Sequence, residues 1–177
     1  FRLNVPNPMP RILDLGNLRD AEEVTDTYEY LETVLSFLYK QNKPIIILGG
    51  SQDLTLPQFN GLASIKDEVN VTIVDERIDL NHISDLTTSD AFLQTIMKSN
   101  QPQLSHLTMF GYQSYFTNYH VLDVINSMSY EAVRLGQARY NIPQFNHIFR
   151  MADMVSMARP FLADPEFVNK AAQGRSH

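Results

Sequence analysis

Short apolar runs alternate with longer amphipathic segments along the whole chain, and this alternation constrains the fold more than any other feature. The apolar runs predict strands at residues 11–16, 44–48, 69–74, 104–110, 130–135 and 152–157. The amphipathic segments predict helices at residues 26–38, 54–66, 89–98, 118–127, 143–150 and 165–173. Strands and helices that alternate through short connections indicate parallel strands joined by helical crossovers. We therefore predict an α/β fold, a three-layer αβα domain around a mainly parallel sheet of about six or seven strands.

Local signals refine two of these segments. Asp26 and Glu29 have the spacing of a capping box, in which each side chain binds an amide of the first helical turn. The run at residues 44–48 is apolar throughout, as expected for a strand that helices cover on both faces. The sequence shows no internal repeat and no linker rich in Pro, Gly or Ser, so we interpret residues 1–177 as a single domain.

The composition excludes several classes of function. Fourteen Lys and Arg against twenty Asp and Glu give a net charge of −6, which argues against a nucleic-acid or anionic-membrane partner. The absence of Cys excludes disulfides, zinc fingers, iron–sulfur clusters and thiol nucleophiles. The longest apolar run is too short to span a bilayer, and no leader follows Phe1. We expect a trimmed or partial soluble chain in the cytoplasm.

Three segments near the predicted strand ends carry a family resemblance. Residues 45–55, 71–80 and 111–116 together resemble the ureohydrolase superfamily of arginase, agmatinase and formimidoylglutamase, and look most like a divergent arginase-like branch. The resemblance extends over residues 11–156. It implies a three-layer α/β fold, a pair of manganese ions and a small amidine or guanidine substrate, whose guanidinium or formimino carbon is hydrolysed by metal-bound hydroxide. Members of the superfamily are considerably longer than this chain, so we expect an arginase-like fold that is truncated.

The metal-binding motifs of that superfamily are only partly kept. The motif Gly-Gly-Asp-His-Ser matches residues 49–53, where Gln52 takes the place of the metal-binding histidine. The motif Asp-Ala-His-x-Asp matches residues 75–79, which keep both aspartates, Asp75 and Asp79, but have Arg77 in place of the histidine. The motif Ser-x-Asp-x-Asp matches residues 156–160, where neither carboxylate is present.

These replacements change the chemistry of the site. Gln52 is at best a weak neutral oxygen donor, and the guanidinium of Arg77 has no lone pair to offer a metal. We interpret Asp75, Arg77 and Asp79 as an internal ion cluster in which the guanidinium replaces the charge of the metals. We therefore predict a ureohydrolase-like domain with a degraded dinuclear manganese site, no assigned catalytic residue, no resident cofactor and little or no hydrolysis.

One alternative keeps a metal. A single manganese or magnesium ion would be held by Asp75 and Asp79, with Asp53 as a further ligand, and would support hydrolysis of linear amidines. His82 follows Asp79 closely enough to be considered as a ligand, although a solvated loop histidine is the commoner case. The aromatic segment at residues 111–116 lines a pocket or packs over the end of the sheet, and the sequence does not decide which.

The last segment resembles a different family. Residues 152–175 look like the flavin barrel of 2,4-dienoyl-CoA reductases, where this stretch closes the barrel and the arginine, here Arg159, helps to hold the flavin phosphate. Such a barrel needs on the order of 200 residues or more, and nothing upstream resembles one. We interpret residues 152–177 as one strand–helix unit that closes the sheet, with a flavin reductase fragment as the alternative. A sheet that lacks strands has a bare edge, so we also expect a homo-oligomer.

Overall fold

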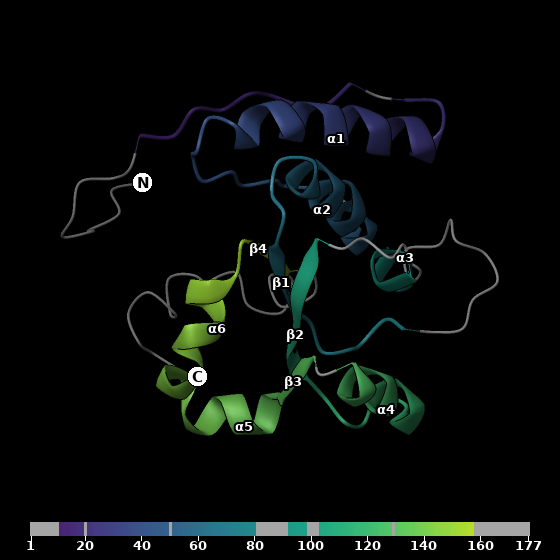
Figure 1. Cartoon of the computed structure of the whole chain (residues 1–177), viewed down its shortest axis with the longest axis vertical. Helices are drawn as coiled ribbons and strands as arrows, with labels where there is room; N and C mark the ends of the chain where they lie inside the picture. The colour runs from purple at the N-terminus through teal and green to yellow at the C-terminus, as the bar shows by residue number, and fades with distance from the viewer. Residues whose placement is uncertain are drawn as a thin grey trace, which may run out of the picture.

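The computed structural model describes residues 11–19, 21–49, 51–80, 92–98, 103–128 and 130–157. In these residues a four-stranded parallel sheet has the order β3-β2-β1-β4 (Figure 1). Its strands are β1 (Val69–Val74), β2 (Leu104–Tyr112), β3 (Glu131–Arg134) and β4 (Met154–Met157). The α-helices are α1 (Val24–Tyr39), α2 (Thr55–Ala63), α3 (Phe92–Lys98), α4 (Tyr119–Ser127), α5 (Leu135–Tyr140) and α6 (Asn146–Met151). Two 3₁₀ turns, η1 (Gln52–Leu54) and η2 (Ile142–Phe145), precede α2 and α6.

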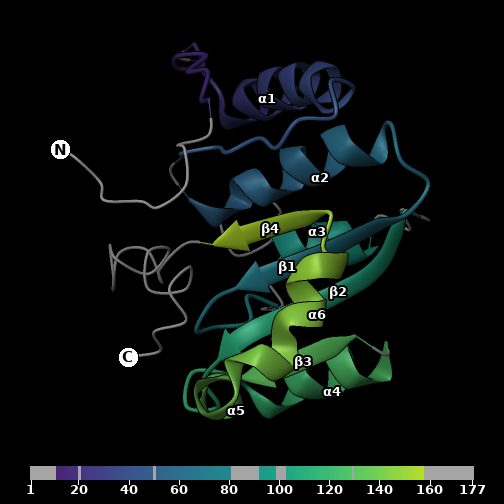
Figure 2. The same ribbon diagram turned by 90° about the vertical axis from the view of Figure 1, so that its left-hand side faces the viewer.

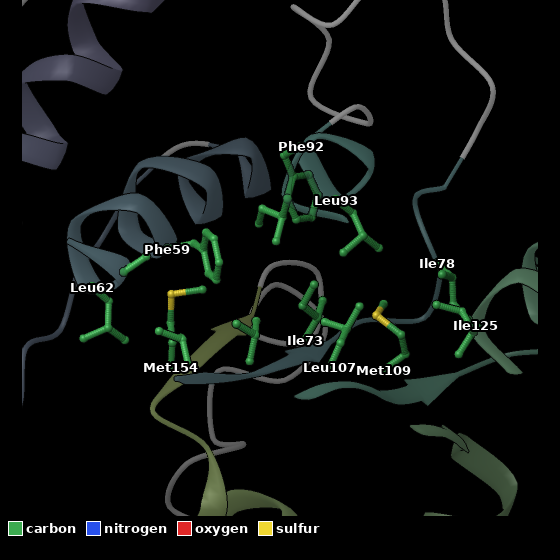
Figure 3. Close-up of a cluster of buried hydrophobic side chains, with 14 of the residues drawn as sticks. Phe59, Leu62, Ile73, Ile78, Phe92, Leu93, Leu107, Met109, Ile125 and Met154 are labelled. Carbon is green, nitrogen blue, oxygen red and sulfur yellow. The ribbon is translucent and has the colours of Figure 1, made fainter. Parts of the chain in front are cut away.

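Helices cover both faces of the sheet. Helices α2, α3 and α4 pack on one face and form the main core with β1 and β2, while α6 lies on the other face (Figures 1 and 2). Figure 3 shows Phe59 of α2 and Leu93 of α3 above Ile73 and Leu107 of the sheet, and these four side chains are at most 1% exposed. A smaller core on the opposite face contains Val133, Ala138 and Ile148. The α/β class that the sequence predicts is therefore confirmed.

Helix α1 forms an additional layer outside α2 (Figure 2). Leu31 and Leu35 are the buried residues of α1. Gly61 of α2 allows the two helices to approach closely, because a Cβ at this position would lie 3.1 Å from the Cβ of Leu35 and 3.3 Å from the backbone oxygen of Glu32. A hydrogen bond of 3.1 Å from Asn60 Nδ2 to Glu32 Oε2 joins the same helices.

The order of the strands places a change of winding direction between β1 and β4. The chain steps from β1 to β2 to β3 in one direction across the sheet, and then returns to pair β4 with the other side of β1. In open parallel sheets, ligands bind beyond the carboxyl ends of the strands at such a reversal. Ile73 of β1 pairs with Ser156 of β4, so the residues that follow β1 lie near the end of β4.

Two predicted strands are wrong. Residues 11–16 and 44–48 have no regular secondary structure, and most of their apolar side chains are exposed, with Leu13 at 81% and Leu48 at 94%. An apolar run becomes a strand only when another strand accepts its backbone hydrogen bonds. Among the described residues no strand pairs with either run, and the sheet that these residues form has four strands where about six or seven were predicted.

The helix predictions are right in kind but differ in detail. Helix α1 begins at Val24, two residues before the predicted cap, and Asp26 lies in its first turn, where a carboxylate favours the helix dipole. Helix α5 follows β3 directly and was not predicted. Pro57 is tolerated because it lies in the first turn of α2, where its missing N–H would have no partner within the helix. The helix predicted at residues 165–173 lies outside the described residues.

Candidate functional site

Four buried polar side chains follow β1, begin α2 or lie in β4. Asp75 directly follows β1 and is 2% exposed, and Asp79 is 8% exposed. Ser156 lies in β4 and Thr55 begins α2; both hydroxyl residues are buried. Buried polar groups are costly unless they are hydrogen-bonded, so each position needs specific partners.

The two hydroxyl groups bond to each other. Thr55 Oγ1 and Ser156 Oγ lie 2.6 Å apart, within hydrogen-bond distance. Because Thr55 starts α2 and follows the η1 turn, this contact fixes the turn against the end of β4. The residues that match the first family motif, at positions 49–53, therefore lie beside β4, in which the third motif begins.

The loop after β1 is held by backbone hydrogen bonds. Asp75 Oδ1 accepts from the backbone nitrogen of Glu76 at 2.6 Å, and that of Arg77 lies 3.4 Å away. The backbone nitrogen of Gln113, after β2, donates to the oxygen of Glu76 at 2.9 Å. Gly111, in β2, has a φ of 91°, a left-handed conformation that suits glycine. These bonds hold the carboxylate of Asp75 in one orientation.

Arg77 does not bridge the two aspartates, which corrects the predicted ion cluster. Arg77 Nε lies 3.8 Å from Glu76 Oε1, and its guanidinium carbon lies 5.2 Å from the ring centroid of Phe116. The Arg77 side chain is about half exposed, at 49%. A guanidinium stacked on an aromatic ring at the surface gains a cation–π contact and keeps most of its hydration. Tyr115 beside Phe116 is 91% exposed, so at least this part of the aromatic segment lies at the surface.

Asp53 is engaged by two hydroxyl groups. Tyr28 Oη of α1 donates to Asp53 Oδ2, and Ser51 Oγ donates to Asp53 Oδ1. Burial, and then the hydrogen bond and negative charge of Asp53, raise the pKa of Tyr28 well above its ordinary value. The tyrosine therefore stays protonated and remains a donor at neutral pH. Asp53 anchors the η1 turn to α1 instead of pointing both oxygens at a cation.

Gln52 contributes an unsatisfied atom to the same turn. Its Nε2 atom is buried and has no hydrogen-bond partner among the described residues. Gln52 takes the place of the histidine in the first family motif, and an amide group there offers one neutral oxygen in place of an imidazole.

The other possible metal ligands of the sequence, chiefly its histidines, lie apart from one another where the structure describes them. Within the described ranges, no three His, Asp or Glu side chains come close enough together to hold a metal ion. His106 lies in β2 with its Nε2 3.9 Å from Glu131, and His147 Nδ1 lies 3.0 Å from the oxygen of Gln144, so each has a partner outside the motifs. His82, Ala158 and Arg159 lie outside the described residues.

Comparison with protein families decides the membership of this chain. The family model described as the arginase family matches residues 3–164. The chain belongs to the arginase family. The ureohydrolase resemblance of the three strand-end segments is thereby confirmed, and the family match spans both sides of the η1 turn and the loop after β1.

Solved structures of arginase-family enzymes share the fold. Formiminoglutamase from Trypanosoma cruzi with Mn²⁺ matches at 15% identity and a TM-score of 0.67, over 75% of this chain and 46% of that one. Formimidoylglutamase from Bacillus subtilis matches at 14% identity and 0.65, over 77% and 45%. Agmatine ureohydrolase from Thermoplasma volcanium matches at 18% identity and 0.59, over 81% and 48%. At these identities the similarity establishes the fold alone.

The match covers a part of those enzymes. This chain spans about half the length of each solved relative, which is consistent with the predicted truncated arginase-like fold. No curated protein sequence matches it. None of the helices in the described parts of the chain is long and apolar enough to cross a membrane.

Sequence reasoning missed two residues of this site. Tyr28 was assigned to the apolar stripe of α1, although its hydroxyl reaches Asp53, a residue 25 positions away. Thr55 stands next to the first motif but has no feature of its own that predicts its bond to Ser156. A buried hydroxyl whose partner lies on another element carries no local sequence signal.

Proposed function

We propose that this arginase-family chain is a ureohydrolase-like domain whose dinuclear manganese centre is degraded, with little or no hydrolysis of amidines or guanidines. The observation that carries the proposal is the position of Arg77. It stands where the family motif has a metal-binding histidine, and its guanidinium is directed to Glu76 and Phe116. A cationic group with no lone pair cannot bind a metal and repels one nearby.

The residues present do not fit a pair of manganese ions. Two dications held close together need bridging carboxylates to neutralise them and imidazoles to complete the coordination. Gln52 offers one neutral oxygen, Arg77 offers none, and Asp53 already accepts from two hydroxyl groups. Asp75 and Asp79 are the kept motif carboxylates. We therefore derive no hydrolytic step through a metal pair and assign no catalytic residue.

Hydrogen bonds hold the two loops of the site in place at the carboxyl ends of the strands. The bond between Thr55 and Ser156 holds the η1 turn, and the bonds around Glu76 hold the loop after β1. The half-exposed guanidinium of Arg77 over Phe116 adds a cationic group beside this loop. A binding or structural role is the function that this arrangement supports best.

Elemental analysis and metal titration test the proposal. We expect the purified chain to contain no stoichiometric manganese, and titration with MnCl₂ to show no tight binding. We also expect no manganese-dependent release of urea from arginine or agmatine and no formamide from N-formiminoglutamate. The agmatine ureohydrolase of Thermoplasma volcanium, assayed in parallel with agmatine, is the positive control. Two manganese ions per chain together with manganese-dependent product release would overturn the proposal.

A single-cation site is the second candidate. It is favoured by one observation: Asp75 and Asp79 are both nearly inaccessible to solvent, which is unusual for carboxylates. If this candidate is right, one manganese ion binds per chain, and Asp79→Asn abolishes the binding. The matched control is Asp123→Asn, which changes an exposed aspartate of α4. The flavin alternative predicts a yellow protein with a flavin absorbance band, and its Arg159 lies outside the described residues.

A further inference from the structure

Helix α1 carries two apolar stripes, of which the fold uses only one. Leu31 and Leu35 are buried in the protein. Tyr30, Val34 and Phe37 follow each other at spacings of four and three residues, so they share a different face of the same helix. This second stripe is exposed: 50% for Tyr30, 42% for Val34 and 65% for Phe37.

The position of the stripe makes its exposure significant. Helix α1 is the outermost layer beyond α2, away from the sheet (Figures 1 and 2). An outer helix ordinarily turns polar residues to water and apolar residues to the core. Two large aromatic side chains and a valine aligned on its solvent side indicate that another molecule covers them.

The charges along α1 are distributed unequally. Acidic residues occupy the first turns of the helix and the residues just before it: Glu22, Glu23, Asp26 and Glu29. The end of the helix has no basic residue in its last turn, but Lys40 directly follows it, and Lys43 lies three residues further on; both are exposed. The exposed stripe therefore lies between an acidic end and a basic end.

We propose that this stripe is a contact between two copies of the chain, in which the α1 helices of both copies pack antiparallel about a twofold axis. Tyr30 and Phe37 lie equally far from the midpoint between Thr33 and Val34. An antiparallel pair centred there places Tyr30 opposite the partner's Phe37 and Val34 close to the partner's Val34. The stripe is thus complementary to itself, as a twofold interface requires.

The charges favour the same arrangement. In the antiparallel pair, Lys40 lies opposite the partner's Thr27, within one helical turn of the partner's Asp26 and Glu23. In a parallel pair the acidic ends would meet each other, and so would the lysines, which is unfavourable. Charge complementarity therefore selects a second copy in one orientation. The inference does not depend on the proposed function, because α1 lies on the far side of α2 from the sheet.

Sedimentation of the full chain over a range of concentrations tests the contact. We expect a dimer that Val34→Asp dissociates, because a carboxylate near the twofold axis would lie against its own copy. The control is Tyr140→Asp, which changes a side chain that is 93% exposed on α5 and should leave the dimer unchanged. Circular dichroism shows whether each variant keeps its fold. A monomer at all concentrations, or a dimer that survives Val34→Asp, would overturn the proposal.

Charge reversal gives a test that does not disturb the stripe. The double variant Lys40→Glu/Lys43→Glu and the double variant Glu23→Lys/Asp26→Lys should each raise the dimer dissociation constant about tenfold or more, since like charges then meet. Mixing the two variants should restore a heterodimer, because both ends then carry opposite charges. A mixture that stays as weak as its components would contradict the antiparallel arrangement.

A disulfide cross-link locates the axis. The chain has no cysteine, so each introduced thiol is unique. Oxidised Val34→Cys should form a covalent dimer in high yield, and Val24→Cys, which is 56% exposed at the start of α1, should not. The edge strand β4 is the competing interface. A dimer that Val155→Lys dissociates, while Val34→Cys fails to cross-link, would assign the contact to the sheet edge.

Discussion

Thr55 Oγ1 at the start of α2 and Ser156 Oγ in β4 lie 2.6 Å apart, although 101 positions separate the two residues in the sequence. The contact joins α2 to β4, at the place where the order of the strands reverses. Both residues are nearly inaccessible, so neither hydroxyl can exchange its partner for bulk water. The bond therefore determines where the η1 turn, with Gln52 and Asp53, stands relative to β4.

We predict that Thr55→Val lowers the free energy of unfolding by about 1–3 kcal/mol, because it leaves the buried Ser156 hydroxyl without its partner. Urea unfolding at neutral pH measures the change. Thr25→Val, at an exposed position of α1, is the control and should change stability by about 0.5 kcal/mol or less. Adding Ser156→Ala should cost less than the sum of the single changes. Strict additivity would show that the two hydroxyls are not coupled.

Gly61→Ala is expected to destabilise the packing of α1 on α2 by about 1–3 kcal/mol, because its Cβ would meet Leu35 and the backbone of Glu32. Gly136→Ala is the matched control, since a Cβ in α5 meets nothing within 4 Å. That change should stabilise the protein by roughly 0.5–1 kcal/mol through helix propensity. Thermal unfolding of both variants checks the prediction, and equal effects of one sign would refute it.

The bond from Tyr28 to Asp53 has a measurable pH signature. Tyr28→Phe should lower the free energy of unfolding by about 1–2 kcal/mol near pH 7, since it removes a hydrogen bond to a charged acceptor. Folding raises the pKa of Tyr28, so its contribution is fully present below the ordinary tyrosine pKa of about 10 and declines as the pH rises above it.

Unfolding of the wild type and Tyr28→Phe should therefore differ by a constant amount between about pH 6 and 9, and the difference should shrink above about pH 10. Tyr140→Phe changes a tyrosine of α5 that is 93% exposed and serves as the control for the loss of a hydroxyl. A difference that stays constant through pH 11 would contradict the proposed role of the phenol proton.

Arg77→His should increase the affinity of the chain for Mn²⁺ by at least about tenfold, because it removes a positive charge and adds an imidazole ligand. Isothermal titration with MnCl₂ measures the change. Arg150→His, at an exposed position of α6, removes the same charge elsewhere and should leave the affinity unchanged. If Arg77→His binds manganese no better than the wild type, then Arg77 is not what weakens the site.

Some of the fold could be predicted because its signals are local. The strands predicted at residues 69–74 and 104–110 are apolar and bounded by polar segments. Both are confirmed: the first is β1, and the second is part of β2. The helix predicted at residues 26–38 has a regular apolar stripe, and it forms as α1, which is longer by two residues at its start and one at its end. Helical hydrogen bonds and apolar periodicity involve neighbours in the chain, so a single segment contains the information.

Apolar and charge patterns gave wrong predictions where the structure depends on a partner that is distant in the sequence. The run at residues 44–48 reads as a central strand, yet Ile46 is 82% and Leu48 is 94% exposed, because no described strand pairs with it. The direction of Arg77 was likewise mistaken. Its two flanking carboxylates suggested an ion cluster, but Phe116, on the loop after β2, supplies the surface on which the guanidinium rests.

The sequence by itself determined the α/β class, the arginase-family motifs and the positions at which the ligands of those motifs are replaced, since these depend on residue type and spacing along the chain. Only the tertiary structure decided that Tyr28 and Ser51 engage Asp53, that Thr55 meets Ser156, and that the second stripe of α1 is uncovered. The physical reason is that a side chain's partner is chosen by how separate elements pack. That choice depends on the whole sheet and its helices, and no single segment contains it.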